Sequence, residues 1–282
     1  MTDTDSRTGR VWLVTGTSSG FGKAIADAVV AHGDCLVAAV LRPSANADLL
    51  AAAPDRVRLV EVDVTNPSQV RDAIRVALDA FGRIDVVVNN AGYGLFGGVE
   101  EATDEQIRKQ FEVNAFGVFD VTRAVLPVLR EQRSGHLIMM SSIAGVVGAP
   151  GLAWYDATKF AVEGFSEALH AEAAAINVRV TIVEPGNFRT NWAGASMARA
   201  NPIPDYAPAI DAYREQFAAI DGKQEGDPAR LAQAIIQIVE RPEPPMRLVL
   251  GEDALGYIRA KLTAQLAEHD RWLPLTTDVA FR

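Results

Sequence analysis

The stretch V-W-L-V-T-G-T-S-S-G-F-G at residues 11–22 decides the fold of this chain. Its first four residues form a short apolar run suited to a buried parallel strand, and an amphipathic run to His32 follows the glycines. Because they lack Cβ atoms, Gly16, Gly20 and Gly22 let the backbone approach a pyrophosphate, whose charge the helix N-terminus favours. The stretch therefore predicts a strand, a glycine turn and a helix that bind a dinucleotide. The alternative is a tight turn with glycine caps.

The alternation of strand and helix continues along the chain. Its short connections indicate an α/β fold with one parallel sheet wound on both faces. Ligands of such sheets bind at the carboxyl ends of the strands. Further strands are predicted at 36–41, 57–62, 84–88, 135–140, 178–184 and 247–250, and further helices at 65–81, 103–130, 154–175, 231–239 and 252–269.

Three segments fall outside this alternation. The polar residues 1–9 are expected to form a flexible N-terminus. From 191 to about 228 the sequence is irregular, with aromatic residues among prolines, so 188–227 is predicted to be a substrate lid or loop. Residues 251–282 form a C-terminal extension that could close a pocket, cover a neighbouring subunit or cap the sheet. With no repeat or second domain in sight, residues 1–282 are interpreted as one nucleotide-binding domain.

Several side chains at strand ends are candidates for nucleotide contacts. The second strand runs into Arg42 with no carboxylate nearby, and a guanidinium is the natural partner of a phosphate. The sequence therefore favours NADP(H) over NAD(H), although Arg42 could equally be a solvated loop charge. Asp63 after the third strand could accept from an adenine amino group or cap the next helix. N-N-A-G at 89–92 keeps the surface low enough for a nucleotide to lie across it.

Tyr155 and Lys159 form the candidate proton-transfer pair. Standing four residues apart, they lie on one face of a helix, about 6 Å apart at Cβ. The ammonium favours the phenolate and is expected to lower the pKa of Tyr155, so that the phenol could pass a proton at neutral pH. Ser142, 13 residues before the tyrosine at a strand end, could hold a substrate oxygen against it. By itself Tyr-x-x-x-Lys is a weak motif.

Other polar and apolar groups complete the predicted site. Asn114 stands among apolar neighbours, so its amide either fixes a helix kink or holds a water. The glycine-rich loop 93–98 is a plausible wall for a substrate pocket. Pro185 and Gly186 set a turn after the sixth strand, and the Thr190 hydroxyl could reach a nicotinamide amide or the pyrophosphate.

Composition narrows the function classes. The 282 residues are 49% hydrophobic and 22% charged, which fits a soluble globular protein. A net charge of −9 and the lack of a basic run argue against nucleic acid or an anionic membrane as partner. No signal peptide or 18-residue apolar span is present, so a cytoplasmic protein is expected. Cys35 is the single cysteine, interpreted as a small buried side chain, and no metal site is expected.

Taken in order, the motifs resemble the short-chain dehydrogenase/reductase family over about residues 8–250. They are T-G-x-x-x-G-x-G at 15–22, N-N-A-G at 89–92, Asn114, Ser142, Y-x-x-x-K at 155–159 and P-G at 185–186. The resemblance implies a Rossmann-type, three-layer α/β/α fold with a doubly wound seven-stranded parallel sheet of order 3-2-1-4-5-6-7. It also implies homodimers or homotetramers that associate through helices 103–130 and 153–175.

The resemblance implies specific roles as well. Tyr155 would be the general acid/base, Lys159 would lower its pKa and bind the nicotinamide ribose, Ser142 would hold the substrate oxygen, and Asn114 would position a water. Two departures concern the cofactor, because neither Leu41 nor Ser19 is basic. The full set of expected cofactor contacts is Gly16, Ser18, Ser19, Gly20, Phe21, Gly22, Arg42, Asp63, Val64, Asn90, Ala91, Gly92, Tyr155, Lys159, Pro185, Gly186, Phe188 and Thr190.

The expected reaction is hydride transfer between a nicotinamide cofactor and a small-molecule alcohol or carbonyl substrate. V-E-P-G-x-F-R-T at 183–190 is similar to the branch with hydroxysteroid-type and retinol-type dehydrogenases and bacterial carbonyl reductases, which suggests a lipophilic substrate. One alternative is an inactive dinucleotide-sensing protein. Others are related reactions of the same family, namely enoyl reduction, dehydration or epimerisation.

Overall fold

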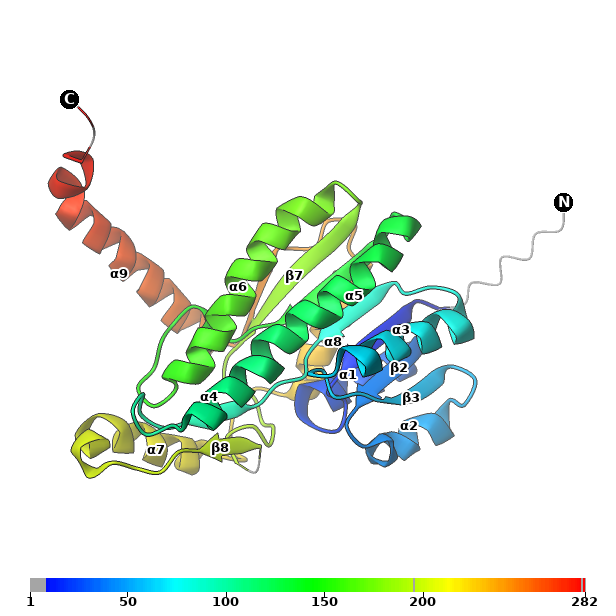
Figure 1. Ribbon diagram of the computed structural model, residues 1–282, viewed down its shortest axis with the longest axis horizontal. Helices are drawn as coiled ribbons and strands as arrows, with labels where there is room; N and C mark the ends of the chain where they lie inside the picture. Colours follow the sequence, from blue (N-terminus) through cyan, green and yellow to red (C-terminus); the bar gives the residue numbers. More distant parts are fainter. Residues whose placement is uncertain (1–8, 195, 280, 282) are drawn as a thin grey trace, which may run out of the picture.

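A parallel sheet forms the centre of the molecule, which is described here as a computed structural model covering residues 9–194, 196–279 and 281 (Figure 1). Within these residues the sheet has seven strands in the order β3-β2-β1-β4-β6-β7-β9, which confirms the predicted fold. The predicted flexible segment 1–9 lies outside the described residues except for Gly9. The strands are β1 (Val11–Thr15), β2 (Cys35–Val40), β3 (Val57–Glu61), β4 (Val86–Asn89), β6 (Gly135–Met140), β7 (Val178–Pro185) and β9 (Arg247–Leu250).

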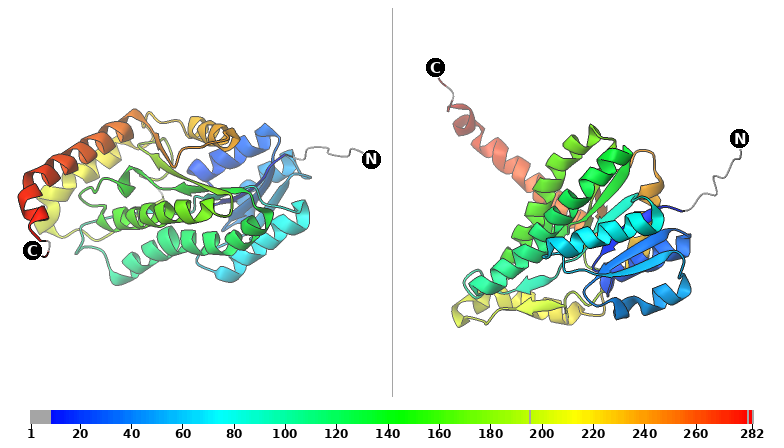
Figure 2. Two further views of the ribbon diagram at one scale, coloured as in Figure 1. Left: turned by 90° about the horizontal axis from the view of Figure 1, so that it is seen from above. Right: turned by 45° about the vertical axis from the view of Figure 1, so that its right-hand side comes forward.

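Helices cover both faces of the sheet (Figures 1 and 2). One apolar cluster joins α1 and α8 to one face, and a second joins α3, α5 and α6 to the other. The long helix α9 projects away from the sheet. The bounds are α1 (Gly20–His32), α2 (Ala47–Ala52), α3 (Pro67–Phe81), α5 (Gly117–Gln132), α6 (Ala153–Ala174), α8 (Pro228–Glu240) and α9 (Glu252–Thr277).

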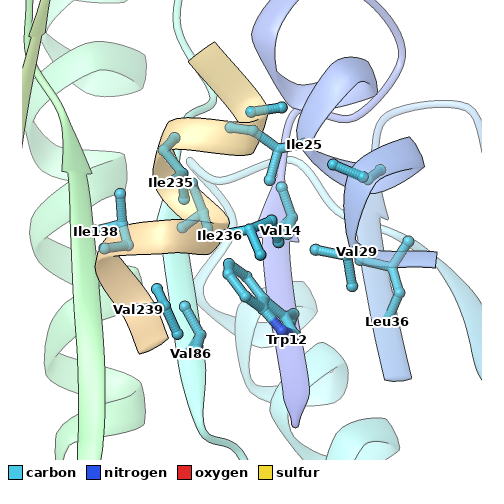
Figure 3. Close-up of a cluster of buried hydrophobic side chains, with 14 of the residues drawn as sticks. Trp12, Val14, Ile25, Val29, Leu36, Val86, Ile138, Ile235, Ile236 and Val239 are labelled. Atoms are coloured by element: carbon cyan, nitrogen blue, oxygen red, sulfur yellow. The ribbon is translucent and has the colours of Figure 1, made fainter. Parts of the chain in front are cut away.

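Trp12 lies at the centre of the cluster between the sheet and α1 and α8 (Figure 3). Its side chain is fully buried among Ile25, Ile235 and other aliphatic residues. Its indole Nε1 donates a 2.8 Å hydrogen bond to Asp34 Oδ2, which satisfies the polar atom of the ring. The first strand is thus anchored immediately before the glycine turn. Cys35 at the start of β2 is buried and free, as predicted.

The helical region predicted at 103–130 is found, and it is continuous from Asp104 to Gln132. It consists of α4 (Asp104–Phe111), a π-helical turn (Glu112–Phe116) and then α5. Thr103 caps α4 in a capping box with Gln106. The π turn contains the buried Asn114, and π turns of this kind are frequent at functional sites.

The region 191–228 is more ordered than predicted. It contains β8 (Met197–Arg199), a 3₁₀ turn (Pro204–Tyr206) and helix α7 (Ala207–Ile220). Strand β8 pairs in parallel with β5 (Gly94–Phe96), so this segment is tied to the loop predicted as a pocket wall. Proline misled the prediction, because Pro208 occupies the first turn of α7, where a missing N–H costs nothing.

The last helix also differs from its prediction. It runs to Thr277, beyond the predicted end at residue 269, although Pro274 lies inside it. Ala254 and Ile258 at its start are buried, whereas Leu262, Leu266 and other large apolar side chains further along are exposed. Within the described residues, no helix has both the length and the apolar character needed to cross a membrane.

Candidate active site

The glycine turn at 16–22 is held against the end of β4. Asn90 Nδ2 donates to the backbone oxygens of Thr15 (2.8 Å) and Gly16 (3.2 Å). A Cβ on Gly22 would lie 2.1 Å from Gly16 O and 2.5 Å from Asn90 Nδ2, so this position accepts only glycine without a backbone shift. The structure therefore brings together the glycine turn and N-N-A-G, with the Asn90 amide used to hold the turn.

Three residues that sequence reasoning missed fix the same turn. The Thr15 hydroxyl donates to Val88 O and accepts from the N–H groups of residues 90 and 91. Thr17 and Asn46, both fully buried, exchange two hydrogen bonds, Thr17 Oγ1 to Asn46 Oδ1 at 2.9 Å and Asn46 Nδ2 to Thr17 O at 3.0 Å. Thr17 lies inside the motif, but nothing in the sequence points to Asn46.

The start of α1 fits the diphosphate of a dinucleotide. Ser18 and Ser19 are exposed, Ser19 makes no side-chain capping bond, and the first turn of α1 carries no acidic residue. Gly20 has a positive φ of 56°, and the nearest atom to a Cβ built there is Thr190 Cβ at 3.6 Å. The positive end of the α1 dipole is thus open to an anion, which could approach the backbone closely at Gly20. The loop that carries Thr190 lies opposite.

Arg42, Asp63 and Val64, the predicted contacts of the adenosine half of the cofactor, differ in how free their side chains are to bind it. Arg42 is exposed just after β2 and makes no ion pair within the described residues. Asp63 Oδ1 accepts from the N–H (2.9 Å) and hydroxyl (2.7 Å) of Thr65 in a local turn, and the cap of the next helix, which was the alternative role for Asp63, is Asn66. The Val64 side chain is buried in the core, where Val64 Cγ2 lies 2.6 Å from the place of a Cβ on Gly117.

The loop after β7 lies beside the glycine turn. The N–H of Gly186 donates to Leu250 O, so the turn after Pro185 is fixed to the end of β9. Phe188 packs edge-on against Phe21, with ring centroids 5.3 Å apart. Phe21 and Phe188, both predicted cofactor contacts, therefore pack their rings against each other. This contact aligns the loop after β7 with α1.

Ser142, Tyr155 and Lys159 meet at the carboxyl end of β6. Ser142 follows the strand, and its Oγ accepts from the N–H of Ala144 and hydrogen-bonds to the Tyr155 side chain. Lys159 Nζ donates to Met140 O at 2.7 Å and lies 5.8 Å from the centroid of the Tyr155 ring. All three side chains are almost fully buried. The hydroxyl pair and the nearby ammonium form the arrangement that the spacing predicted.

Asn114 connects this group to the glycine-rich loop. Its Oδ1 accepts from the N–H of Tyr93 at 3.0 Å, and its Nδ2 donates to Tyr93 O at 2.8 Å and to Thr158 Oγ1 at 3.4 Å. Thr158 in turn donates to the backbone oxygen of Tyr155. Gly92 makes room for the amide, since a Cβ there would lie 3.1 Å from Asn114 Oδ1. Thr158 was missed, although it lies within the Tyr-x-x-x-Lys motif.

The expected lowering of the Tyr155 pKa is not found in this structure. Burial raises the pKa of Tyr155, the hydrogen bond with Ser142 lowers it by less, and the charge of Asp156 raises it further. Burial likewise lowers the pKa of Lys159 to about 8, against a raising effect of Glu163. The phenol is therefore protonated at neutral pH, which makes it a proton donor in this state.

Aromatic residues cover the Tyr155 ring. Trp192 lies 5.0 Å from it between ring centroids, and Phe217 of α7 packs on Trp192 at 6.1 Å. Phe96 of β5 extends the group, 5.7 Å from Phe217. Two other aromatic residues lie elsewhere: Phe188 is against Phe21, and Trp154 Nε1 donates to Val99 O. The cover is apolar and comes mainly from the segment that follows β7.

Comparison with known proteins decides the family. A family model described as short chain dehydrogenase matches residues 10–201, which is more than half of the chain. The chain belongs to the short-chain dehydrogenase family. Among its relatives, oxidoreductase BOA17 of Botryotinia fuckeliana (strain B05.10) is 38% identical over 268 residues, with 95% of this chain and 98% of that protein covered. A 3-ketodihydrosphingosine reductase of Bacteroides thetaiotaomicron is 38% identical over 248 residues, covering 86% and 88%.

Solved structures of short-chain dehydrogenases share the fold. A short-chain dehydrogenase from Streptomyces avermitilis superposes with a TM-score of 0.91 at 39% identity, over 98% of this chain and 100% of that one. A family member from Burkholderia phymatum in complex with NAD gives 0.79 at 27% identity, over 89% and 92%. An alcohol dehydrogenase from Thermococcus sibiricus complexed with 5-hydroxy-NADP gives 0.71 at 25% identity, over 86% and 95%. Nicotinamide dinucleotides thus bind to relatives of this short-chain dehydrogenase.

Proposed function

We propose that this short-chain dehydrogenase is an NAD(P)-dependent oxidoreductase that interconverts a secondary alcohol and a ketone, or reduces an aldehyde. The observation that carries the proposal is the buried group of Ser142, Tyr155 and Lys159 at the same sheet edge as the glycine turn. The nicotinamide ring, when bound, supplies or accepts the hydride at the substrate carbon. A protein that only senses a dinucleotide has no need to bury a phenol, a hydroxyl and an ammonium together.

Each polar residue has a distinct part in the proposed reaction. In the direction of reduction, Tyr155 gives its proton to the carbonyl oxygen, which Ser142 holds by a hydrogen bond. Lys159 stabilises the phenolate that remains, and its ammonium would also hold the nicotinamide ribose of a bound cofactor. Asn114 keeps the π turn and the Tyr93 backbone in place, so that a water held there can return a proton toward Lys159. The Tyr155 phenol carries its proton at neutral pH, as an acid must before the transfer, although burial also makes it a weaker acid.

The test of the proposed function is a substrate survey with both reduced nucleotides. Purified protein is mixed with NADPH or NADH and a panel of aldehydes, ketones and quinones of increasing apolar size, and nucleotide oxidation is followed by absorbance. We expect turnover with at least one carbonyl class, accompanied by formation of the matching alcohol. Tight nucleotide binding without turnover across the whole panel would instead support the sensing alternative.

The proposed substrate is lipophilic. Trp192, Phe217 and Phe96 surround the Tyr155 ring with apolar surface, and residues 188–227, which supply the first two, are proposed to act as a lid. The name of the 3-ketodihydrosphingosine reductase among the relatives points to a ketone on a long aliphatic chain. A substrate would displace the aromatic cover to reach Tyr155.

Arg42 is proposed to select NADP(H). Removing its guanidinium in Arg42→Ala should weaken NADPH binding about tenfold, since one charge-assisted phosphate contact is lost, and leave NADH binding unchanged. Fluorescence titration of both nucleotides measures this. The matched control is Arg75→Ala, which removes the same charge from the exposed face of α3. An equal loss for both nucleotides, or none, would contradict this role for Arg42.

We also propose a homodimer or homotetramer that associates through α4, α5 and α6. Two large apolar side chains on this part of the surface, Phe116 of the π turn and Phe160 of α6, are 51% and 47% exposed. Association of two copies here would cover both rings.

A further inference from the structure

A cluster of charged residues joins α6, β7 and β9 and begins one helical turn after Lys159 on α6. Arg247 of β9 contacts three carboxylates, with Nε 3.3 Å from Glu163 Oε2 and 3.5 Å from Glu184 Oε1, and Nη2 on Glu167. The side chains of Glu163 and Glu184 are only 9% and 2% exposed, whereas that of Glu167 is 63% exposed. Two of the three carboxylates are therefore kept from water, and neither has a role in the reaction described so far.

Glu163 is the member of this cluster that lies on the same face of α6 as Lys159. It follows the lysine by one helical turn on α6, and its charge acts on the ammonium. Packing fixes it there, because a Cβ on Gly145 would lie 2.9 Å from Glu163 Cγ and 2.4 Å from Ser141 Oγ. The segment that starts with Ser142 thus lies directly on Glu163.

A buried ammonium needs a counter-charge to stay protonated. Burial lowers the pKa of Lys159 to about 8, and Glu163 is the group that raises it. Without that carboxylate, the lysine would lose its proton at a lower pH. A neutral amine would no longer stabilise a phenolate on Tyr155.

Arg247 is the group that favours the ionised form of Glu163. On balance burial raises the pKa of Glu163, and the charge and hydrogen bond of Arg247 oppose that rise. Glu184 has less support, because burial and the repulsion by Glu163 raise its pKa to about 7. Glu184 is therefore the carboxyl that takes up a proton more readily around neutral pH, which leaves Arg247 to Glu163 and Glu167.

We propose that Glu163 is a positioning residue for proton transfer, because it holds Lys159 as an ammonium beside Tyr155 while Arg247 favours Glu163 as a carboxylate. The inference rests on the proposed roles of Tyr155 and Lys159. It adds a chain of charges that runs from β9 through α6 to the phenol.

The groups that face Lys159 come from four elements. On α6 these are Tyr155 before it and Glu163 after it, and at the end of β6 it is the backbone oxygen of Met140. Arg247 of β9 and Glu184 of β7 act on Lys159 indirectly, because Arg247 contacts Glu163 and Glu184 contacts Arg247. When Glu163 becomes neutral, the positive charge of Arg247 remains, so the pKa of Lys159 should fall. Ionisation of Glu184, relieved of the repulsion, would offset part of that fall.

The experiment compares Glu163→Gln with Glu167→Gln. Both remove one carboxylate that contacts Arg247, but Glu167 is exposed and does not act on Lys159. The chain has five lysines, so the side-chain resonances of isotopically labelled lysine can be followed individually in a pH titration by NMR, with Lys159→Met assigning the signal. In Glu163→Gln the Lys159 midpoint should move down by about one pH unit. In Glu167→Gln it should stay at the wild-type value.

The pH profile of turnover gives the second readout. The ammonium is present below the Lys159 pKa, so turnover should fall as the pH rises through about 8 in the wild type, and at lower pH in Glu163→Gln. Should Glu163→Gln not fold, Glu163→Asp withdraws the charge by one methylene and should move the midpoint in the same direction by less. An unmoved Lys159 midpoint in the folded variant overturns the inference. Since the NMR titration needs no turnover, that result is independent of whether the proposed dehydrogenase activity is found.

Discussion

Replacing Tyr155 with phenylalanine should lower the rate of carbonyl reduction by about 10²–10⁴-fold, because the substrate oxygen loses its proton donor. Nucleotide affinity should stay nearly unchanged. The ring can keep its contact with Trp192, and the glycine turn and Arg42 lie outside the altered group. Steady-state kinetics on the best substrate of the survey, with fluorescence titration of the nucleotide, measure the two effects separately. Near-normal turnover in Tyr155→Phe would refute the proposed acid role.

The matched control is Tyr213→Phe. Tyr213 packs against the same apolar cluster as Tyr155 but lies on α7. Loss of its hydroxyl should change turnover little. If both variants lost activity equally, the effect would reflect packing of the cluster and not proton transfer.

Replacing Trp12 with alanine should have the largest effect on stability, lowering the free energy of unfolding by about 3–5 kcal/mol. The indole is fully buried between the sheet and α1 and α8, so its removal leaves a cavity there (Figure 3). It also leaves Asp34 without the Nε1 donor. Urea unfolding measures the loss. It is followed by circular dichroism and not by fluorescence, because the substitution removes the Trp12 signal and leaves that of the other tryptophans.

Trp12→Phe separates the two contributions. It keeps most of the apolar contact and removes the hydrogen bond to Asp34, so we expect a loss of about 1–3 kcal/mol. Asp34 would still accept from the N–H of Arg10 and contact His32. An unfolding midpoint in Trp12→Ala equal to that of the wild type would show that this residue does not support the core.

The strands and the meeting of the motifs followed from local sequence patterns, whereas the order of the strands came from the family resemblance. Apolar runs such as β1 and β2 are short and buried along their whole length, and Thr103 and Gly82 mark helix ends by their own chemistry. Parallel topology then places every strand end at one edge, which is why Ser142, separated by more than a hundred residues from Gly16, could be assigned to the same site.

What could not be predicted depends on contacts between distant segments. The π turn at Asn114 is accompanied by hydrogen bonds to Tyr93, which no periodicity records. The pKa of Tyr155 depends on how deeply its ring is buried, and that depth is known only once Trp192 is placed. Likewise, Glu163 resembles any polar residue on a helix until β9 brings Arg247 beside it.

The aromatic cover over Tyr155 has a consequence for how such a protein can change over time. Trp192 and Phe217 belong to one continuous stretch between β7 and α8, whereas Ser142, Tyr155, Lys159 and Asn114 lie on other elements. Substitutions within that stretch could therefore change the preferred substrate and leave the four proposed site residues in place.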